Sequence, residues 1–278
     1  YVFHRRVSMT EAMGVLFEGN AVEYRITIPE GLTSEQIVAR LRENDVLVGE
    51  LPRTPREGSL MPDTYKFTRG TSRQQIIDQM TRLQTRALQD IWNRRVADLP
   101  VRSPEELVIL ASIVEKETAK ADERPRVAGV FVNRLNRRMR LESDPTVIYG
   151  VVGGRGRLDR PISRADLDRL TPYNTYRVEG LPPTPIGNPG RASMEAVANP
   201  MRHREVFFVA DGTGGHAFAE TLDQHNRNVA RWRQIERERG AASPAVLTAP
   251  AEATPRPAAA VPVGAAPPAA GAQVPALR

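Results

Sequence analysis

Apolar and polar residues alternate close to the start of the chain. Residues 22–28 read Val-Glu-Tyr-Arg-Ile-Thr-Ile, which is the period-two pattern of a half-buried strand. Residues 29–31, Pro-Glu-Gly, are typical of a turn. Thr33 and Gln36 then stand at the spacing of a capping box, with an apolar helical stripe behind them. The pattern predicts a small strand-and-helix unit at the N-terminus.

Helical spacing dominates the middle of the chain. Apolar residues recur with the helical period over residues 76–91. Ser103 at a cap position, Pro104 at the first helical position and Glu106 as the capping-box carboxylate form a dense helix-start signal. Residues 107–114 are apolar on nearly every face, so we expect this helix to lie in the core.

The second half of the chain mixes helices, loops and strands. An amphipathic helix is expected over residues 125–138, and regular structure thins over residues 143–190, where Pro and Gly accumulate. Residues 205–210 predict a buried strand, which residues 216–218 join as a partner across a Gly-rich turn. A final amphipathic helix is expected over residues 221–239. Without regular βαβ alternation, this order favours the α+β class.

Composition and pattern divide the 278 residues into three parts. We predict a small α/β unit over residues 1–58, a mixed α+β domain over residues 59–240 and a tail over residues 241–278. The tail is rich in Ala and Pro, lacks aromatic residues and has few charges. Such a segment cannot bury enough apolar area to offset its chain entropy, so we expect it to be disordered.

Composition excludes several classes of site. The chain has no Cys, which excludes disulfides, thiolate zinc sites and a thiol nucleophile. Its four His residues do not stand at metal-ligand spacing, so we expect no metal. The net charge of +6 is spread along the chain and suits nucleic acid, anionic lipid or an acidic cell-wall polymer equally well. The pattern starts abruptly at Tyr1, which we interpret as the loss of an N-terminal signal or anchor.

Two acids end the apolar helix. Glu115-Lys116-Glu117 can be an ordinary solvated helix end. However, Glu117 continues the apolar row of Ile113 and Val114, whereas Glu115 projects about 160° away by the helix period. Desolvation and the negative helix terminus should both raise the pKa of Glu117, as a general acid near neutrality requires.

Other polar candidates follow that helix. Asp144 lies in a Ser-Asp-Pro phrase, which typically opens a helix and so favours capping over catalysis. Tyr149, Tyr173 and Tyr176 are expected in polar loops. Such rings can stack on sugars or fix loops to a core, and the pattern alone leaves both interpretations open.

Several phrases taken together resemble one known family. They are residues 111–118 (ASIVEKET), 132–135 (VNRL), 141–150 (LESDPTVIYG), 171–176 (TPYNTY), 180–183 (GLPP) and 208–212 (FVADG). In this order, over residues 62–239, the chain is similar to the YceG-like family, whose members are endolytic murein transglycosylases. Residues 27–33 (TIPEGLT) resemble part of the family's LysM-like module. The Ala/Pro-rich tail has no counterpart in this resemblance.

The resemblance implies an enzyme that cuts nascent peptidoglycan strands internally, at the β-1,4 bond between N-acetylmuramic acid and N-acetylglucosamine, leaving a 1,6-anhydro end. Glu117 would be the catalytic acid, acting without cofactor or metal. Candidates for orienting the glycan are Glu115, Asp144, Thr146, Tyr149, Tyr173, Asn174, Tyr176 and Asn188.

The resemblance also implies a location and partners. The enzyme would face the periplasm from the inner membrane, held by a single-pass anchor that this chain lacks. Its partners would be glycan strands and cell-wall synthases, and nucleic acid is not among them.

Two rival functions stay open. Glu117 and Asp144 together could serve a two-carboxylate murein hydrolase, which would leave a reducing end. Alternatively, the charge and the partial LysM-like segment suit a non-catalytic module that binds glycan or nucleic acid.

Overall fold

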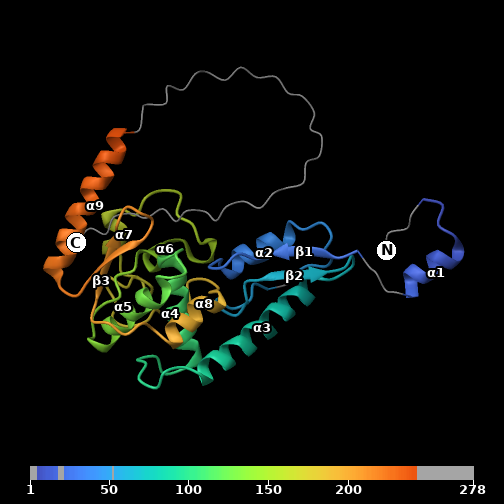
Figure 1. Cartoon of the computed structure of the whole chain (residues 1–278), viewed down its shortest axis with the longest axis horizontal. Helices are drawn as coiled ribbons and strands as arrows, with labels where there is room; N and C mark the ends of the chain where they lie inside the picture. The colour runs from blue at the N-terminus through green and yellow to red at the C-terminus, as the bar shows by residue number, and fades with distance from the viewer. Residues whose placement is uncertain (1–4, 18–21, 52, 243–278) are drawn as a thin grey trace, which may run out of the picture. The chain divides into compact units, whose positions relative to one another are not determined.

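The computed structural model describes residues 5–17, 22–51 and 53–242 (Figure 1). The chain forms two compact units, Tyr1–Val206 and Phe207–Arg278, which we describe separately. In the described residues, helices accompany two small antiparallel sheets, which confirms the α+β class. The predicted tail lies outside these residues except for positions 241 and 242, which end the last helix.

The N-terminal elements form where the pattern predicts them. After α1 (Met9–Phe17), strand β1 (Tyr24–Thr27) leads to α2 (Ser34–Arg42), whose capping box joins Thr33 and Gln36 as expected. β1 pairs antiparallel with β2 (Thr64–Phe67). The sequence did not predict β2, because four residues are too few to show a period.

One hydrophobic core joins this small sheet to its helices. The buried residues come from β1, α2, β2 and the first half of α3 (Arg73–Asn93). Tyr65 and Phe67 on β2 pack in the same cluster as Ile26 and Ile37. Residues beyond position 58 therefore complete the N-terminal core, and the predicted boundary at that position stays a prediction.

Helix α4 (Pro104–Glu117) is the buried centre of the first unit. Every residue from 107 to 114 is buried, as the apolar pattern predicted. α4 packs against α3, α5 (Arg124–Asn136) and α8 (Arg191–Ala198) (Figure 1). Ser103 caps the helix as expected, but Glu106 bonds the amide of Arg102, so the capping box is only half formed.

Regular structure thins beyond residue 143, as the pattern predicts, but short elements remain. Helix α6 (Asp144–Val152) runs into a short 3₁₀ turn (Gly153–Arg155), and α7 (Arg164–Asp168) follows. Pro145 lies in the first turn of α6, as the Ser-Asp-Pro phrase indicates, although the sequence did not predict how far this helix extends. Residues 171–190 form turns and loops as expected.

The second unit is a hairpin with one helix. Strand β3 (Phe207–Ala210) pairs antiparallel with β4 (His216–Ala219), and α9 (Leu222–Ala242) packs on both. The order and pairing confirm the predicted elements, although most of β3 is only half-buried. Among the helices of the described ranges, none is both long and apolar enough to cross a membrane.

Candidate active site

Glu117 is the last residue of α4 and its carboxyl group lies at the edge of the core. The residue is partly buried, and Ser143 Oγ donates a hydrogen bond of 2.5 Å to its Oε1. Helix α4 positions this acid, because its buried residues 107–114 fix the helix in the core and so fix the position of Glu117 at its end. Glu117 therefore carries a shielded carboxyl group, although the residue keeps some exposed surface.

The surroundings of Glu117 favour its protonated form. The pKa of Glu117 is raised from 4.5 to about 7, mainly by burial, and the negative charge of Asp144 contributes to this rise. The Ser143 hydrogen bond and the positive charge of Arg134 both oppose these effects by lowering the same pKa. A carboxyl group with this pKa holds a proton in much of the population near neutrality, which is what a general acid needs.

Ser143 is held in place by two threonines. Its backbone amide donates to Thr175 Oγ1 at 2.9 Å, and its carbonyl accepts from Thr146 Oγ1 at 2.6 Å. The two threonine hydroxyls are themselves 2.8 Å apart. The sequence does not point to Ser143 as a site residue, because a serine before Asp-Pro is typical of a helix cap. Ser143 is indeed the N-cap residue of α6, but its side chain makes no capping bond.

Arg134 is a second residue that the sequence analysis missed. Its side chain is buried, and it donates to the carbonyls of Leu141 and Val206 and to Glu142 Oε2. These bonds fix the loop that leads into Ser143. The only sequence signal for this role was its place in the VNRL phrase, and Arg side chains are more often exposed.

Asp144 and Tyr176 complete the polar group around Glu117. Tyr176 donates its hydroxyl hydrogen to Asp144 Oδ1 at 2.7 Å. Burial raises the pKa of Asp144, while this hydrogen bond lowers it. Asp144 opens α6, as the cap interpretation predicted, and its charge also acts on Glu117. The structure thus brings three predicted site residues, Glu117, Asp144 and Tyr176, together.

Glu115 has a different neighbourhood from Glu117, as the helix period predicted. Its Oε2 accepts from the amide of Gly190 at 2.8 Å, and Arg124 Nη2 lies 3.8 Å from its Oε1. Its side chain is only 6% exposed. Glu115 therefore ties the loop before α8 to α4. Within the described ranges, no cluster of three or more His, Asp or Glu side chains is arranged to hold a metal ion.

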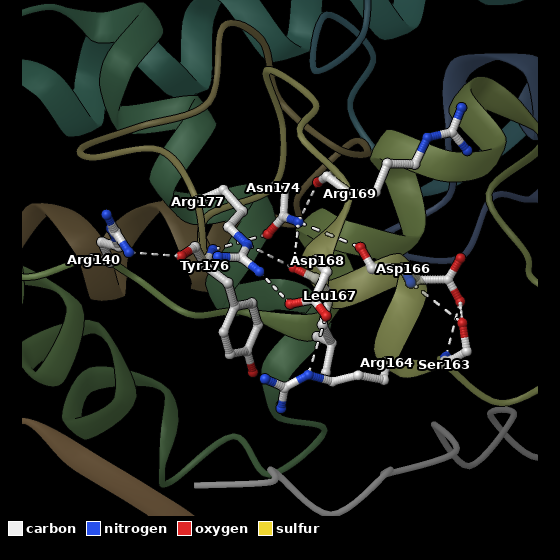
Figure 2. A network of polar contacts seen from close by, with 10 residues as sticks. All are labelled: Arg140, Ser163, Arg164, Asp166, Leu167, Asp168, Arg169, Asn174, Tyr176 and Arg177. Carbon is white, nitrogen blue, oxygen red and sulfur yellow. Dashed lines mark hydrogen bonds and ion pairs between the residues drawn. The ribbon is translucent and has the colours of Figure 1, made fainter.

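The two predicted amide residues are buried in loop junctions. Asn174 Nδ2 donates to the carbonyls of Leu167 and Arg169, and its Oδ1 accepts from the amide of Tyr176, as Figure 2 shows. Asn188 is fully buried. In this conformation both side chains are committed to protein atoms, so the geometry favours positioning roles for Asn174 and Asn188 over direct contact with a ligand.

Tyr149 lies on α6 and not in a loop as expected, and its ring pairs with that of Tyr173 in the turn after α7. Their ring centroids lie 4.9 Å apart with an interplanar angle of 57°. Tyr149 donates its hydroxyl hydrogen to Glu57 Oε2 at 3.1 Å, and the hydroxyl oxygens of Tyr173 and Thr184 are 2.8 Å apart. Glu57 was not predicted, because its role depends on a contact across 92 positions of the sequence.

Changing Ser143 to Ala is expected to raise the pKa of Glu117 above its present value of about 7. The serine hydroxyl stabilises the carboxylate form, and losing a hydrogen bond to a charged group should move the pKa upward by about one unit. An NMR titration of the Glu117 carboxyl carbon measures this shift. Ser143→Thr keeps the hydroxyl and is the control, and an unchanged titration in Ser143→Ala would contradict the assigned role.

Comparison with known proteins agrees with this architecture. A family model described as the YceG-like family matches residues 1–231. The endolytic murein transglycosylase of Bacillus subtilis (strain 168) is 36% identical over 185 residues, which is 66% of this chain and 49% of that protein. The protein of the same name from Streptococcus pneumoniae (strain D39) is 32% identical over 224 residues, 72% of this chain and 39% of its own length.

A solved structure is similar as well. The crystal structure of a yceG-like protein from Listeria monocytogenes superposes with a TM-score of 0.60 at 30% identity, covering 80% of this chain and 81% of that one. The chain spans about half or less of the length of these two curated relatives. Because the family model covers most of its residues, this protein belongs to the YceG-like family.

Proposed function

We propose that this protein is an endolytic peptidoglycan lytic transglycosylase with Glu117 as its single catalytic acid. The observation that carries the proposal is the shielded carboxyl of Glu117, whose pKa of about 7 keeps part of the population protonated at neutral pH. Two curated relatives named endolytic murein transglycosylase support the substrate class. Membership of the YceG-like family supports the same assignment.

The proposed reaction moves one proton out of Glu117 and one back. Protonated Glu117 donates to the oxygen that links N-acetylmuramic acid C1 to the next N-acetylglucosamine, and this C–O bond breaks. The C6 hydroxyl of the same muramic sugar then attacks C1 and gives its proton to the Glu117 carboxylate. The product is a 1,6-anhydro ring. Since the nucleophile belongs to the substrate, its effective concentration is as high as ~10⁵ M or more, and no water needs activation.

The residues around Glu117 suit these two half-steps. Between them Glu117 is a carboxylate, a form that the Ser143 hydroxyl and the Arg134 charge both stabilise. The Asp144 charge and burial favour the return of the proton by raising the pKa of Glu117. Asp144 would also stabilise positive charge that develops on the sugar ring, as carboxylates do in glycosidases.

The other predicted substrate residues take two proposed roles. Tyr149, Tyr173 and Tyr176 would contact or orient the glycan, since each retains exposed surface. The buried residues would hold the loops that present these rings. They are Glu115, Thr146, Asn174 and Asn188.

A two-carboxylate hydrolase is the second candidate function. It is favoured by the position of Asp144, which acts on the charge state of Glu117 and has a raised pKa of its own. Hydrolysis would use water in place of the C6 hydroxyl and would yield a reducing end.

Mass spectrometry of the products tests the proposal. Uncrosslinked glycan strands are digested with the wild type and, in parallel, with Glu117→Gln. A new 1,6-anhydro end with the wild type alone is expected. A reducing end, which is heavier by one water, would assign the reaction to a hydrolase. If the wild type binds glycan without cleaving it, the chain is a glycan-binding module. If binding shows no preference for glycan and weakens steeply as the salt concentration rises, the ligand is nucleic acid.

The proposed setting is the periplasmic face of the inner membrane, where peptidoglycan strands are assembled. The proposal includes a single-pass N-terminal anchor and cell-wall synthases as partners. The relatives named endolytic murein transglycosylase support action at the cell wall. Residues 1–58 would correspond to part of a LysM-like module. Retention of the full-length protein in the membrane fraction, with protease access only from the periplasm, is the expected result of a fractionation experiment.

A further inference from the structure

Lys116 stands between the two acids that end α4 and differs from the other two lysines of the chain. The chain has 39 Lys and Arg residues, and only Lys66, Lys116 and Lys120 are lysines. Lys66 lies 3.1 Å from Glu23 and Lys120 lies 3.8 Å from Glu123. In the described part of the chain, Lys116 has no carboxylate oxygen within 4.0 Å. Its ammonium group is therefore available to another partner.

The stem of Lys116 is fixed although its ammonium is available. Gly31 has a φ of +76°, and a Cβ built there would lie 3.7 Å from Lys116 Cε and 3.8 Å from its Cδ. The Lys116 methylenes thus pass along the backbone of the Gly31 turn. The residue stays exposed, yet the surrounding protein lowers its pKa by desolvation. An ammonium group that is partly desolvated but still accessible can donate hydrogen bonds to a ligand.

Lys116 is connected to the tyrosine pair through Glu57. The charges of Glu57 and Glu115 both raise the pKa of Lys116, so both acids lie within electrostatic range of its ammonium. Glu57 in turn accepts the Tyr149 hydroxyl, and the Tyr149 ring packs on that of Tyr173. Gly31, against which the Lys116 stem lies, donates its amide hydrogen to Asn188 O at 2.8 Å, and Asn188 Nδ2 donates to Glu57 Oε1 at 3.1 Å. These contacts bring Lys116, Glu57 and the two aromatic rings into one neighbourhood, the Lys116 network.

This network lies beside the Glu117 site and not within it. Lys116 directly precedes Glu117 on α4. On α6, Tyr149 follows Asp144 by five positions, which is about 7.5 Å along a helix axis. The two groups use different partners, Ser143 for Glu117 and Glu57 for Tyr149. Helices α4 and α6 thus carry Glu117 and Asp144 and also Lys116 and Tyr149, whereas Glu57 and Tyr173 lie in turns.

We propose that Lys116, Tyr149 and Tyr173 form a sugar-binding subsite next to the catalytic acid, in which the Lys116 ammonium donates hydrogen bonds to uncharged oxygen atoms of the glycan. The inference rests on the proposed function. The charges of two carboxylates, Glu57 and Glu115, act on this one ammonium group, so it offers little net positive charge to an anionic group. Hydroxyl and acetamide oxygens fit, because a lysine has three donors on a freely rotating head.

Binding measurements in the Glu117→Gln protein test the subsite without interference from cleavage. The probes are a neutral oligomer of β-1,4-linked N-acetylglucosamine and uncrosslinked peptidoglycan strands. Adding Lys116→Met keeps the methylene stem on Gly31 but removes the three donors. We expect roughly tenfold weaker binding of both probes, the loss of a hydrogen bond from a charged donor. Lys120→Met is the matched control and should leave both affinities unchanged.

The outcomes separate the alternatives. A loss that is equal at low and high salt supports contact with neutral oxygen atoms. A loss confined to the peptide-bearing strands and abolished by salt would overturn the proposal in favour of a carboxylate contact. Unchanged binding in Lys116→Met, or no binding of the neutral oligomer at all, would overturn it as well.

Kinetics with Lys116→Met in the otherwise wild-type protein distinguish this inference from the proposed function. We expect KM to rise while kcat stays within about twofold, because uniform binding is lost. A merely structural role would lower the melting temperature and leave KM unchanged. If the wild type leaves the glycan uncut, the proposed function fails; if it cuts and Lys116→Met has the wild-type KM, only the subsite fails.

Discussion

Glu117→Gln is expected to lower kcat/KM for glycan cleavage by about 10²–10⁴-fold, the usual contribution of a general acid. Glutamine has nearly the shape of glutamate, and its amide oxygen can still accept the Ser143 hydrogen bond seen at 2.5 Å. It has no proton to give to the glycosidic oxygen. The measurement is the initial rate of release of anhydro ends below pH 7, and Glu115→Gln is a comparison that should retain a larger share of the activity.

The same substitution should change stability in a pH-dependent direction. Folding raises the pKa of Glu117 from 4.5 to about 7, so the folded wild type binds a proton that the unfolded chain has lost within this window. Its free energy of unfolding therefore falls as pH rises from 4.5 to about 7. Gln does not titrate, so Glu117→Gln should be more stable than the wild type by about 1–3 kcal/mol above this window and show no such gain below it.

Urea unfolding of both proteins at several pH values checks the prediction. An equal difference in stability at every pH would mean that burial does not perturb Glu117 and would remove the physical basis for its role. The pH profile of the wild type gives an independent reading. Because the acid must be protonated, cleavage should decline as pH rises through about 7, the pKa of Glu117.

Asn188→Leu is expected to lower the free energy of unfolding by about 3–5 kcal/mol. The side chain is fully buried, and its Nδ2 donates to Leu32 O, Ser34 Oγ and Glu57 Oε1 at 3.0–3.1 Å. Its Oδ1 accepts from the amide of Leu60 at 2.9 Å. Leucine has a similar volume but satisfies none of these groups, so several buried polar atoms lose their partners at once.

Thermal and urea unfolding measure the Asn188→Leu effect. Asn199→Leu changes the same residue type at an exposed position and should stay within about 0.5 kcal/mol of the wild type. If both variants were equally stable, Asn188 would not join the N-terminal core to the loop before α8. Loss of stability together with loss of the Tyr149 contact to Glu57 is the expected pattern, because Glu57 shares the Asn188 amide.

The sequence could predict what depends on local spacing. The apolar run of α4, the cap at Ser103 and the capping box of Thr33 and Gln36 all follow from neighbours within one helical turn. The different faces of Glu115 and Glu117 follow from the helix period in the same way, and their separate partners agree with it.

The remainder depends on contacts between distant segments. Glu57 meets Tyr149 across 92 positions, and Asn188 meets Leu60 across 128. No local period contains such information. The Asn188 side chain illustrates the difficulty, since a polar residue in a Pro- and Gly-rich phrase suggests an exposed loop, whereas the fold encloses it completely.

Ser143 shows how a local rule can mislead at a functional position. A serine before Asp-Pro is a favoured N-cap, and Ser143 does occupy that position on α6. Its hydroxyl nevertheless donates to Glu117, and the helix is left without a side-chain cap. Local rules are expected to fail where a side chain is committed to a site.

The pairing of β1 with β2 has a practical consequence for anyone who prepares the larger part of this protein alone. A truncated chain that begins at residue 59 would retain β2 but lose the strand that covers it. Tyr65 and Phe67 are 2% and 5% exposed in the intact protein. In the fragment they would lie on an unpaired strand, whose free backbone N–H and C=O groups can pair with other chains. Such a fragment should aggregate, and a soluble preparation would have to start upstream of Tyr24.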